Sequence, residues 1–171
     1  ENFDVLASLN IKENQSIGLF VGEFNASDQD AGSNLVYALT SGAGDSGNGL
    51  FALESNGTLR TAEVLDYESN ASRLIRVRAT DDRGASIEAV FAFTVEDQND
   101  PPANLVAPSA LNIMENQPVS SVVGEFTASD EDANATLTYE LASGAGDADN
   151  GLFALEANGT LKTSIVFDFE N

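Results

Sequence analysis

One stretch of the sequence, Asp97-Gln98-Asn99-Asp100-Pro101-Pro102, combines residue types that can bind a metal ion. Its carboxylate and carboxamide groups are the hard oxygen donors that Ca²⁺ takes as ligands. The prolines have a fixed φ and no backbone N–H, so a strand ladder cannot continue through them, and Pro101 biases Asp100 toward extended geometry. The stretch therefore predicts a stiff, acidic linker between two blocks of sequence. Two interpretations remain open at this point: a cation-binding linker, or an acidic interdomain loop that binds no metal.

Other acidic residues occur in pairs separated by one position. The pairs are Asp28/Asp30, Asp66/Glu68, Asp130/Asp132 and Asp168/Glu170. Residues i and i+2 of an extended chain point to the same side, so each pair places two carboxylates together. This arrangement is costly unless a cation lies between the charges, although a single pair is also compatible with a solvated loop edge. The recurrence of the pairs, together with Glu13, Asp81 and the linker, favours a Ca²⁺-binding set.

The charge of the chain argues against several classes of function. The net charge is −21, the pI is about 4.1 and only seven residues are basic. Nucleic-acid binding and docking on an anionic membrane are therefore not expected. Without His or Cys, the chain cannot form a His-based triad, a Cys nucleophile, a usual zinc site or a disulfide, and we expect no enzyme. No apolar run is long enough to span a bilayer and no signal peptide opens the sequence, so we expect a segment of a longer protein.

The sequence aligns with itself, without a gap, after a shift of about 102 residues. More than half of the aligned positions are identical. The matching segments include 9–11 with 111–113, 13–15 with 115–117, 21–24 with 123–126, 41–45 with 143–147 and 56–59 with 158–161. This similarity indicates a tandem duplication, and the linker divides the chain into blocks 1–102 and 103–171.

Each block has the pattern of an all-β domain. Alternation of apolar residues such as Phe20 and Phe24 with polar ones such as Glu23 predicts short strands joined by turns. Seven strands are expected in the first block, at 4–12, 18–27, 35–40, 51–53, 58–62, 74–81 and 88–97. Asn56-Gly57 is a strong hairpin signal. No segment has a sustained helical period, so we predict a β-sandwich with aligned sheets.

The second block lacks counterparts of the last two strands, 74–81 and 88–97. In a seven-stranded sandwich these strands lie beside the third strand and complete one sheet. The inner face around Phe126, Phe153 and Leu155 would then lose half of its cover, and exposed apolar surface and open sheet edges promote association. We therefore expect this block to be destabilised, to exchange strands with a neighbour in a homo-oligomer, or to be the product of trimming.

Five motifs of the chain resemble those of a known family, the cadherin and cadherin-like repeats. These are I-K-E-N at 11–14, A-S-D-Q-D-A-G-S-N at 26–34, L-D-Y-E at 65–68, V-R-A-T-D-D-R-G at 77–84 and D-Q-N-D-P-P at 97–102. They occur in the family's order, and the resemblance covers the whole chain apart from the missing end of the second block. It implies tandem Greek-key, immunoglobulin-like β-sandwiches of the cadherin type, the second without its last two strands.

The resemblance also implies a set of ligands for three Ca²⁺ ions at the junction between repeats. From the first block it implies Glu13, Asp66, Glu68, Asp97 and Asp100, with the backbone carbonyl of Gln98. Asn99, Asp130, Asp132 and a backbone carbonyl near Thr136 would serve the third ion. That site is expected to be weakened, because the second block has no counterpart of Asp81. The resemblance implies that Asp28, Asp30 and Asp81 would bind ions shared with a preceding repeat. Glu115, Asp168 and Glu170 would do the same with a following repeat.

These features predict extracellular, Ca²⁺-binding repeats of a cell-surface protein that acts in adhesion, with Ca²⁺ stiffening the junction. The expected partners are other cadherin-like repeats or a protein or glycan ligand on a cell surface. Some cadherins exchange a Trp-bearing first strand, but this chain has no Trp, so the resemblance does not imply that mode of adhesion here. The Asp- and Asn-rich, Lys-poor composition suggests a bacterial surface protein. A carbohydrate-binding module or a passive spacer remains the alternative, because a fold does not fix a function.

Overall fold

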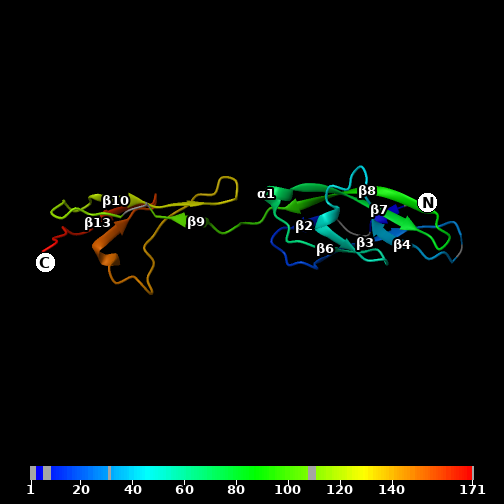
Figure 1. Cartoon of the computed structure of the whole chain (residues 1–171), viewed down its shortest axis with the longest axis horizontal. Coiled ribbons are helices and arrows are strands. Elements are labelled where there is room, and N and C mark those ends of the chain that lie inside the picture. The colour runs from blue at the N-terminus through cyan, green and yellow to red at the C-terminus, as the bar shows by residue number, and fades with distance from the viewer. Residues whose placement is uncertain (1–2, 6–8, 31, 108–110, 171) are drawn as a thin grey trace. The chain divides into compact units, whose positions relative to one another are not determined.

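The computed structural model describes residues 3–5, 9–30, 32–107 and 111–170. The chain divides into two compact units, Glu1–Gln98 and Asn99–Asn171. The boundary between the two sequence repeats, placed after residue 102, remains a prediction. Strands are the main regular secondary structure of both units, and the only regular helices in the described residues are single turns (Figure 1). No helix in those residues has the length and apolar character needed to cross a membrane.

The first unit consists of two four-stranded sheets, drawn in blue to green in Figure 1. One sheet has the order β1-β3-β6-β5 and contains β1 (Phe3–Val5), β3 (Phe20–Ala26), β5 (Phe51–Leu53) and β6 (Thr58–Thr61). The other has the order β2-β8-β7-β4 and contains β2 (Asn10–Lys12), β4 (Val36–Leu39), β7 (Ser72–Thr80) and β8 (Ser86–Glu96). β2 runs parallel to β8, and the other neighbouring strands are antiparallel.

The two sheets pack face to face through the apolar residues that alternate along their strands. Phe51 of β5 meets Phe93 of β8 edge to face, with ring centroids 4.6 Å apart, and Phe24 of β3 lies 4.9 Å from Phe91 of β8. The buried apolar residues of this core are Ile11, Val21, Phe24, Tyr37, Phe51, Leu59, Leu65, Ile75, Val77, Ala79, Phe93 and Val95. The predicted all-β sandwich is therefore confirmed.

Some local features differ from the prediction. The single strand expected over 4–12 is divided into β1 and β2, which belong to different sheets, and positions 6–8 lie outside the described residues. A short helix, α1 (Tyr67–Asn70), and the 3₁₀ turns η1 (Asn48–Leu50) and η2 (Asn150–Leu152) were not predicted. Each of these is about one turn long, which is too short to produce a hydrophobic period in the sequence.

The second unit retains only part of this architecture. Its strands are β9 (Ala103–Val106), β10 (Val122–Glu125), β11 (Thr127–Ser129), β12 (Phe153–Leu155) and β13 (Thr160–Thr163). They form a sheet of order β10-β13-β12 and a pair β9-β11. The counterparts of β2 and β4, at 112–114 and 138–141, are not strands in the described part of this unit. In the first unit these two strands pair with β8 and β7, which have no counterparts in the sequence. Lacking those hydrogen-bonding neighbours, the two segments do not form strands.

The missing strands change the burial of the core. Phe24 and Phe51 are only 2% and 5% exposed, whereas their counterparts Phe126 and Phe153 are only half-buried. Leu161 remains buried because it lies on β13, whose neighbours β10 and β12 are both present. The described part of residues 99–170 therefore contains only part of a sandwich, as the sequence predicted.

Candidate metal centre

Glu13 is a buried carboxylate in the first unit, only 1% exposed. Because β2 pairs in parallel with β8, the residue after β2 lies beside the end of β8, and the Glu13 N–H donates to the Glu96 carbonyl oxygen at 3.2 Å. The Glu13 Oε2 accepts the Tyr67 N–H and the Oε1 accepts the Gln98 N–H, each at 2.6 Å. One carboxylate therefore holds both the first residue of α1 and the start of the acidic linker.

Glu13 forms an acidic cluster with Glu68 and Asp97. Each residue offers a carboxylate oxygen, and these oxygens lie within 4.8 Å of one another. Glu68 is carried by α1 and Asp97 follows β8 directly, so separate segments contribute the carboxylates. The side-chain amide of Gln98 donates to the Asp97 carbonyl oxygen. The donor set fits Ca²⁺, which binds oxygen ligands and offsets the repulsion between neighbouring carboxylates.

Asp66 is the N-cap of α1. Its Oδ2 accepts the Ser69 hydroxyl at 2.8 Å, and its Oδ1 accepts the Ser69 N–H at 3.1 Å. The bond from the Ser69 hydroxyl, followed by that from the Ser69 N–H, lowers the pKa of Asp66 and favours its ionised form. This cap was not predicted from the sequence. The available signal was an Asp before a short polar turn, because Asp is a preferred N-cap residue.

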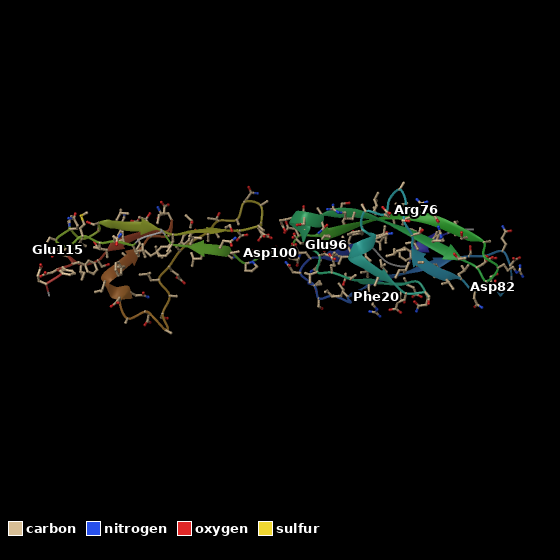
Figure 2. All side chains as sticks on the ribbon, in the orientation of Figure 1. Phe20, Arg76, Asp82, Glu96, Asp100 and Glu115 are labelled. Carbon is tan, nitrogen blue, oxygen red and sulfur yellow. The ribbon has the colours of Figure 1, made fainter. Side chains whose placement is uncertain are left out.

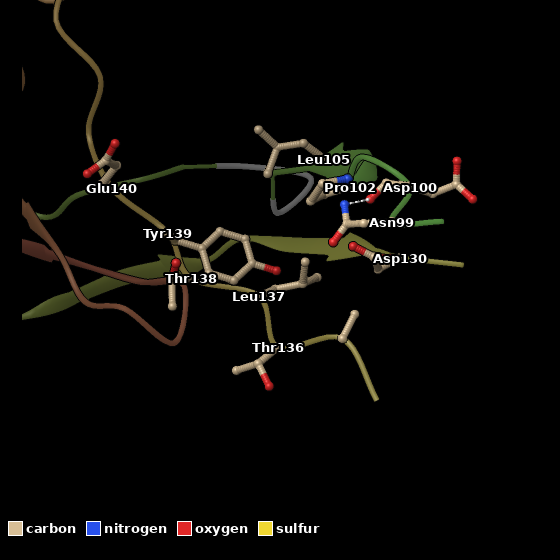
Figure 3. A pocket seen from close by; sticks show the side chains of 11 residues that line it. Asn99, Asp100, Pro102, Leu105, Asp130, Thr136, Leu137, Thr138, Tyr139 and Glu140 are labelled. Carbon is tan, nitrogen blue, oxygen red and sulfur yellow. Dashed lines mark hydrogen bonds between the residues drawn. The ribbon is translucent and has the colours of Figure 1, made fainter. Parts of the chain in front are cut away.

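The second unit brings the predicted ligands Asp100, Asp130 and Asp132 together. The Asp100 N–H donates to Asp132 Oδ2 at 2.8 Å, and the Asp132 N–H donates to Asp130 Oδ1 at 3.0 Å. The Asn99 side-chain amide donates to the Asp100 carbonyl oxygen at 2.9 Å (Figure 3). Asn99, Asp100, Asp130 and the exposed Thr136 line a cavity of about 530 Å³. The predicted ligands of this unit therefore share one surface.

The set Asp28, Asp30 and Asp81 is also brought together, and these residues line a cavity of about 390 Å³. Asp28 Oδ1 accepts the Asp30 N–H at 2.7 Å, and Asp81 Oδ1 accepts the N–H groups of Arg83 and Ala85 at 2.9 and 2.7 Å. Arg83 also forms an ion pair with Asp30 Oδ2 at 2.5 Å. Arg83 was not predicted to pair with these acids, although its place in D-D-R-G, directly after two Asp residues, was a usable signal.

Glu115, which Figure 2 labels, forms the corresponding cluster of the second unit with Asp168 and Glu170. The three carboxylate oxygens lie within 4.8 Å of one another. Glu115 Oε2 accepts the Phe169 N–H at 3.1 Å, and Asp168 Oδ1 accepts the Glu170 N–H at 3.1 Å. Glu115 is half-buried, whereas Glu13 is buried. The duplicated sequence therefore builds a similar cluster twice, with a longer hydrogen bond and greater exposure in the second unit.

The β-sandwich fold and the acidic clusters agree with a match to one protein family. The model of the cadherin domain family matches residues 7–96, which is more than half of the chain. The chain therefore belongs to the cadherin domain family.

Relatives of the chain include large animal protocadherins. It is 34% identical over 170 residues to mouse Protocadherin Fat 4, a match that covers 96% of this chain and 3% of that protein. It is 36% identical over 171 residues to human Protocadherin-16, covering 94% of this chain and 5% of that protein. The chain thus spans only a small fraction of the lengths of these relatives.

Solved structures agree with the fold. The EC1-2 structure of human protocadherin-24 has a TM-score of 0.68 and 25% sequence identity, and the match covers 99% of this chain and 80% of that one. Mouse cadherin-23 EC22-24 has a TM-score of 0.61, 23% identity and coverage of 99% and 55%, and supports the fold alone. The expected fold class and the extracellular, cell-surface location are confirmed. The expectation of a bacterial source finds no support, because the relatives are animal proteins.

Proposed function

We propose that the chain forms two cadherin repeats, residues 1–102 and 103–171, of an extracellular adhesion protein, and that Ca²⁺ stiffens their connection. The observation that carries this proposal is the cluster of Glu13, Glu68 and Asp97, in which a buried carboxylate holds the N–H of Gln98 at 2.6 Å. An acidic linker that is anchored in this way differs from a free, solvated loop. Family membership supports the same assignment, since cadherin domains bind Ca²⁺ in general.

The proposed ligands come from both units. The proposed first-unit ligands are Glu13, Asp66, Glu68, Asp97 and the Gln98 carbonyl, and the second-unit ligands are Asn99, Asp100, Asp130, Asp132 and a carbonyl near Thr136. A bound Ca²⁺ would supply positive charge that offsets the repulsion among these acids. Asp28, Asp30 and Asp81 would serve a preceding repeat in the same way. In the first unit the Glu13 carboxylate is held by the Tyr67 N–H at the start of α1 and by the Gln98 N–H, two residues after β8.

The partners follow from this role. The proposed binding partners are other cadherin-like repeats, or a protein or glycan on a cell surface. Self-association of the chain through its second unit is the proposed route to a homo-oligomer. The mechanism requires no catalysis, since the residues bind ions and fix geometry. The protocadherin relatives support this role for the domain type.

A calorimetric Ca²⁺ titration of metal-stripped protein tests the proposal. Asp97→Asn and Glu68→Gln should each weaken at least one site by about tenfold or more, because each removes a charged ligand. Glu23→Gln is the matched control, since it removes one charge from an exposed position on β3. No binding at millimolar Ca²⁺, or equal losses in the control, would refute the site.

Small-angle scattering with and without chelator tests the stiffening separately. Removal of Ca²⁺ should broaden the distribution of interatomic distances, because the acids then repel one another and the linker loses its fixed geometry. Identical curves in both conditions would mean that the ions, even if bound, do not stiffen the connection.

A further inference from the structure

The turn α1 carries Glu68, one of the three clustered carboxylates of the first unit, and it is too short to keep its shape by itself. It comprises only Tyr67–Asn70, and the Asn70 N–H donates to the Asp66 carbonyl oxygen at 2.8 Å. Fixing the first turn of a helix costs more conformational freedom than one such hydrogen bond offsets. The position of the Glu68 carboxylate therefore depends on contacts that hold α1 from outside.

Two carboxylates hold the start of α1. Glu13 accepts the Tyr67 N–H at 2.6 Å, and Asp66 accepts both the N–H and the hydroxyl of Ser69. These bonds satisfy N–H groups that have no partner within a helix, because they belong to its first turn. The carbonyl groups at the end of a helix have the same need, and here they require donors from outside α1.

Arg73 of β7 supplies such a donor at the end of the turn. Its Nη2 donates to the Ser69 carbonyl oxygen at 2.7 Å, and its Nη1 donates to the Ser72 carbonyl oxygen at 2.9 Å. A cationic side chain interacts favourably with the carbonyl groups at the end of a helical turn. The guanidinium thus joins α1 to the first residue of β7.

The backbone that carries Arg73 is fixed in the sheet. Arg73 lies opposite Phe93 where β7 pairs with β8. Gly47 packs directly against this position, since a Cβ on Gly47 would lie 2.8 Å from Arg73 Cβ. The Gly47 N–H also donates to the Leu74 carbonyl oxygen at 2.7 Å. Arg73 therefore connects α1 to a part of the first unit that is held by the sheet itself.

We propose that Arg73 is a positioning residue, which holds α1 so that Glu68 lies beside Glu13 and Asp97 in the candidate metal centre. This inference rests on the proposed function, because it concerns how the Ca²⁺ ligands are placed. Arg73 is not itself a ligand, since a guanidinium has no acceptor atom. Its positive charge opposes a bound cation, whereas its effect on the position of Glu68 favours one.

Calorimetric Ca²⁺ titrations of the metal-stripped wild-type and Arg73→Gln chains separate these two effects. Arg73→Gln should weaken Ca²⁺ binding by about threefold or more, because the ion must then order α1 when it binds. Removal of the positive charge alone would tighten binding instead. Arg73→Lys keeps the charge without the planar fork of donors, so it should restore only part of the affinity.

Arg78→Gln is the matched control for net charge. Arg78 also lies on β7, and its guanidinium pairs with Glu88 rather than with α1. This variant should not weaken Ca²⁺ binding. Unchanged or tighter binding in Arg73→Gln, or an equal loss in the control, overturns the positioning role.

A double-mutant cycle with Glu68→Gln distinguishes positioning from a general loss of stability. If Arg73 acts through Glu68, then Arg73→Gln should have little further effect on Ca²⁺ affinity in the Glu68→Gln background. Equal losses in both backgrounds overturn the proposal. A wild-type chain that binds no Ca²⁺ overturns the proposed function as well, whereas wild-type binding with equal affinity in Arg73→Gln overturns this inference alone.

Hydrogen exchange in the presence of chelator provides a readout without the metal. In Arg73→Gln, the amides of Tyr67 and Ser69 should exchange about threefold faster or more, because α1 opens more often. They should keep their wild-type rates in Arg78→Gln. Unchanged exchange of α1 in Arg73→Gln would show that Arg73 does not hold the turn and would overturn the proposal.

Discussion

The two hydrogen bonds to Glu13 give a quantitative prediction for the substitution Glu13→Gln. The carboxylate accepts two backbone N–H groups, those of Tyr67 and Gln98, each at 2.6 Å. The Gln side chain has nearly the same shape but only one acceptor oxygen, so one buried N–H would face an NH₂ group. A hydrogen bond to a charged group contributes about 1.5–3 kcal/mol, and a buried unsatisfied donor costs about 1–3 kcal/mol. We therefore expect the free energy of unfolding of the first unit to fall by about 2–4 kcal/mol.

The duplication provides a matched control, Glu115→Gln. Glu115 is half-buried, and its carboxylate accepts the Phe169 N–H at the longer distance of 3.1 Å. Water can replace a partly exposed hydrogen bond, so we expect this variant to lose less than about 1 kcal/mol. Both variants remove one negative charge from the acidic clusters. A difference between them therefore reports burial and hydrogen bonding rather than net charge.

Hydrogen exchange measured by mass spectrometry in the presence of chelator separates the two units. In Glu13→Gln, the amides of β7 and β8 should exchange at least about 30-fold faster under conditions where exchange reports the opening equilibrium. The amides of β12 and β13 should keep their wild-type rates. Unchanged protection of β7 and β8 in chelator, combined with a loss of Ca²⁺ binding, would show that Glu13 acts only as a ligand and that the structural reasoning is wrong.

Three further substitutions test individual contacts. Ser69→Ala should raise the pKa of Asp66 toward 3.8 in an NMR titration, and an unchanged pKa would contradict the cap. Because folding lowers this pKa, the ionised Asp66 stabilises the fold above its unfolded pKa, and this stabilisation is lost as the pH falls through the folded value. Arg78→Ala should likewise raise the lowered pKa of Glu88, and no change would exclude that ion pair as its cause. Gly57→Ala should lower the free energy of unfolding by about 2 kcal/mol or more in denaturant melts. The φ of Gly57 is +97°, and a Cβ at this position would lie 2.4 Å from the Phe24 carbonyl oxygen of β3. Unfolding at the wild-type denaturant concentration would refute this prediction.

Much of the fold follows from local patterns in the sequence. Strands β5 and β6 lie where alternation and the Asn56-Gly57 turn predicted them, because a hairpin depends on residues that are near each other in the chain. The acidic residues were recognisable from their recurrence in both copies of the repeat. The extended geometry expected for Asp66 and Glu68 was wrong, because Glu68 lies in α1 and Asp66 caps it. The partners of those acids were less predictable. The Tyr67 N–H that binds Glu13 and the Arg83 that pairs with Asp30 come from segments about 50 residues away in the sequence.

The second unit shows a feature that the local sequence pattern alone does not predict, namely which segments become strands. Residues 35–39 and 137–141 have related patterns, L-V-Y-A-L and L-T-Y-E-L, and the same prediction applies to both. Only the first segment contains a strand, β4. Alternation establishes which side chains face a core, and that information is present in each copy. Strand formation also requires a neighbour to pair with the backbone N–H and C=O groups, and in the first unit β7 is that neighbour. The sequence by itself therefore determined the repeat, the inward residues and the acids, whereas the tertiary contacts decided which of the repeated segments became strands.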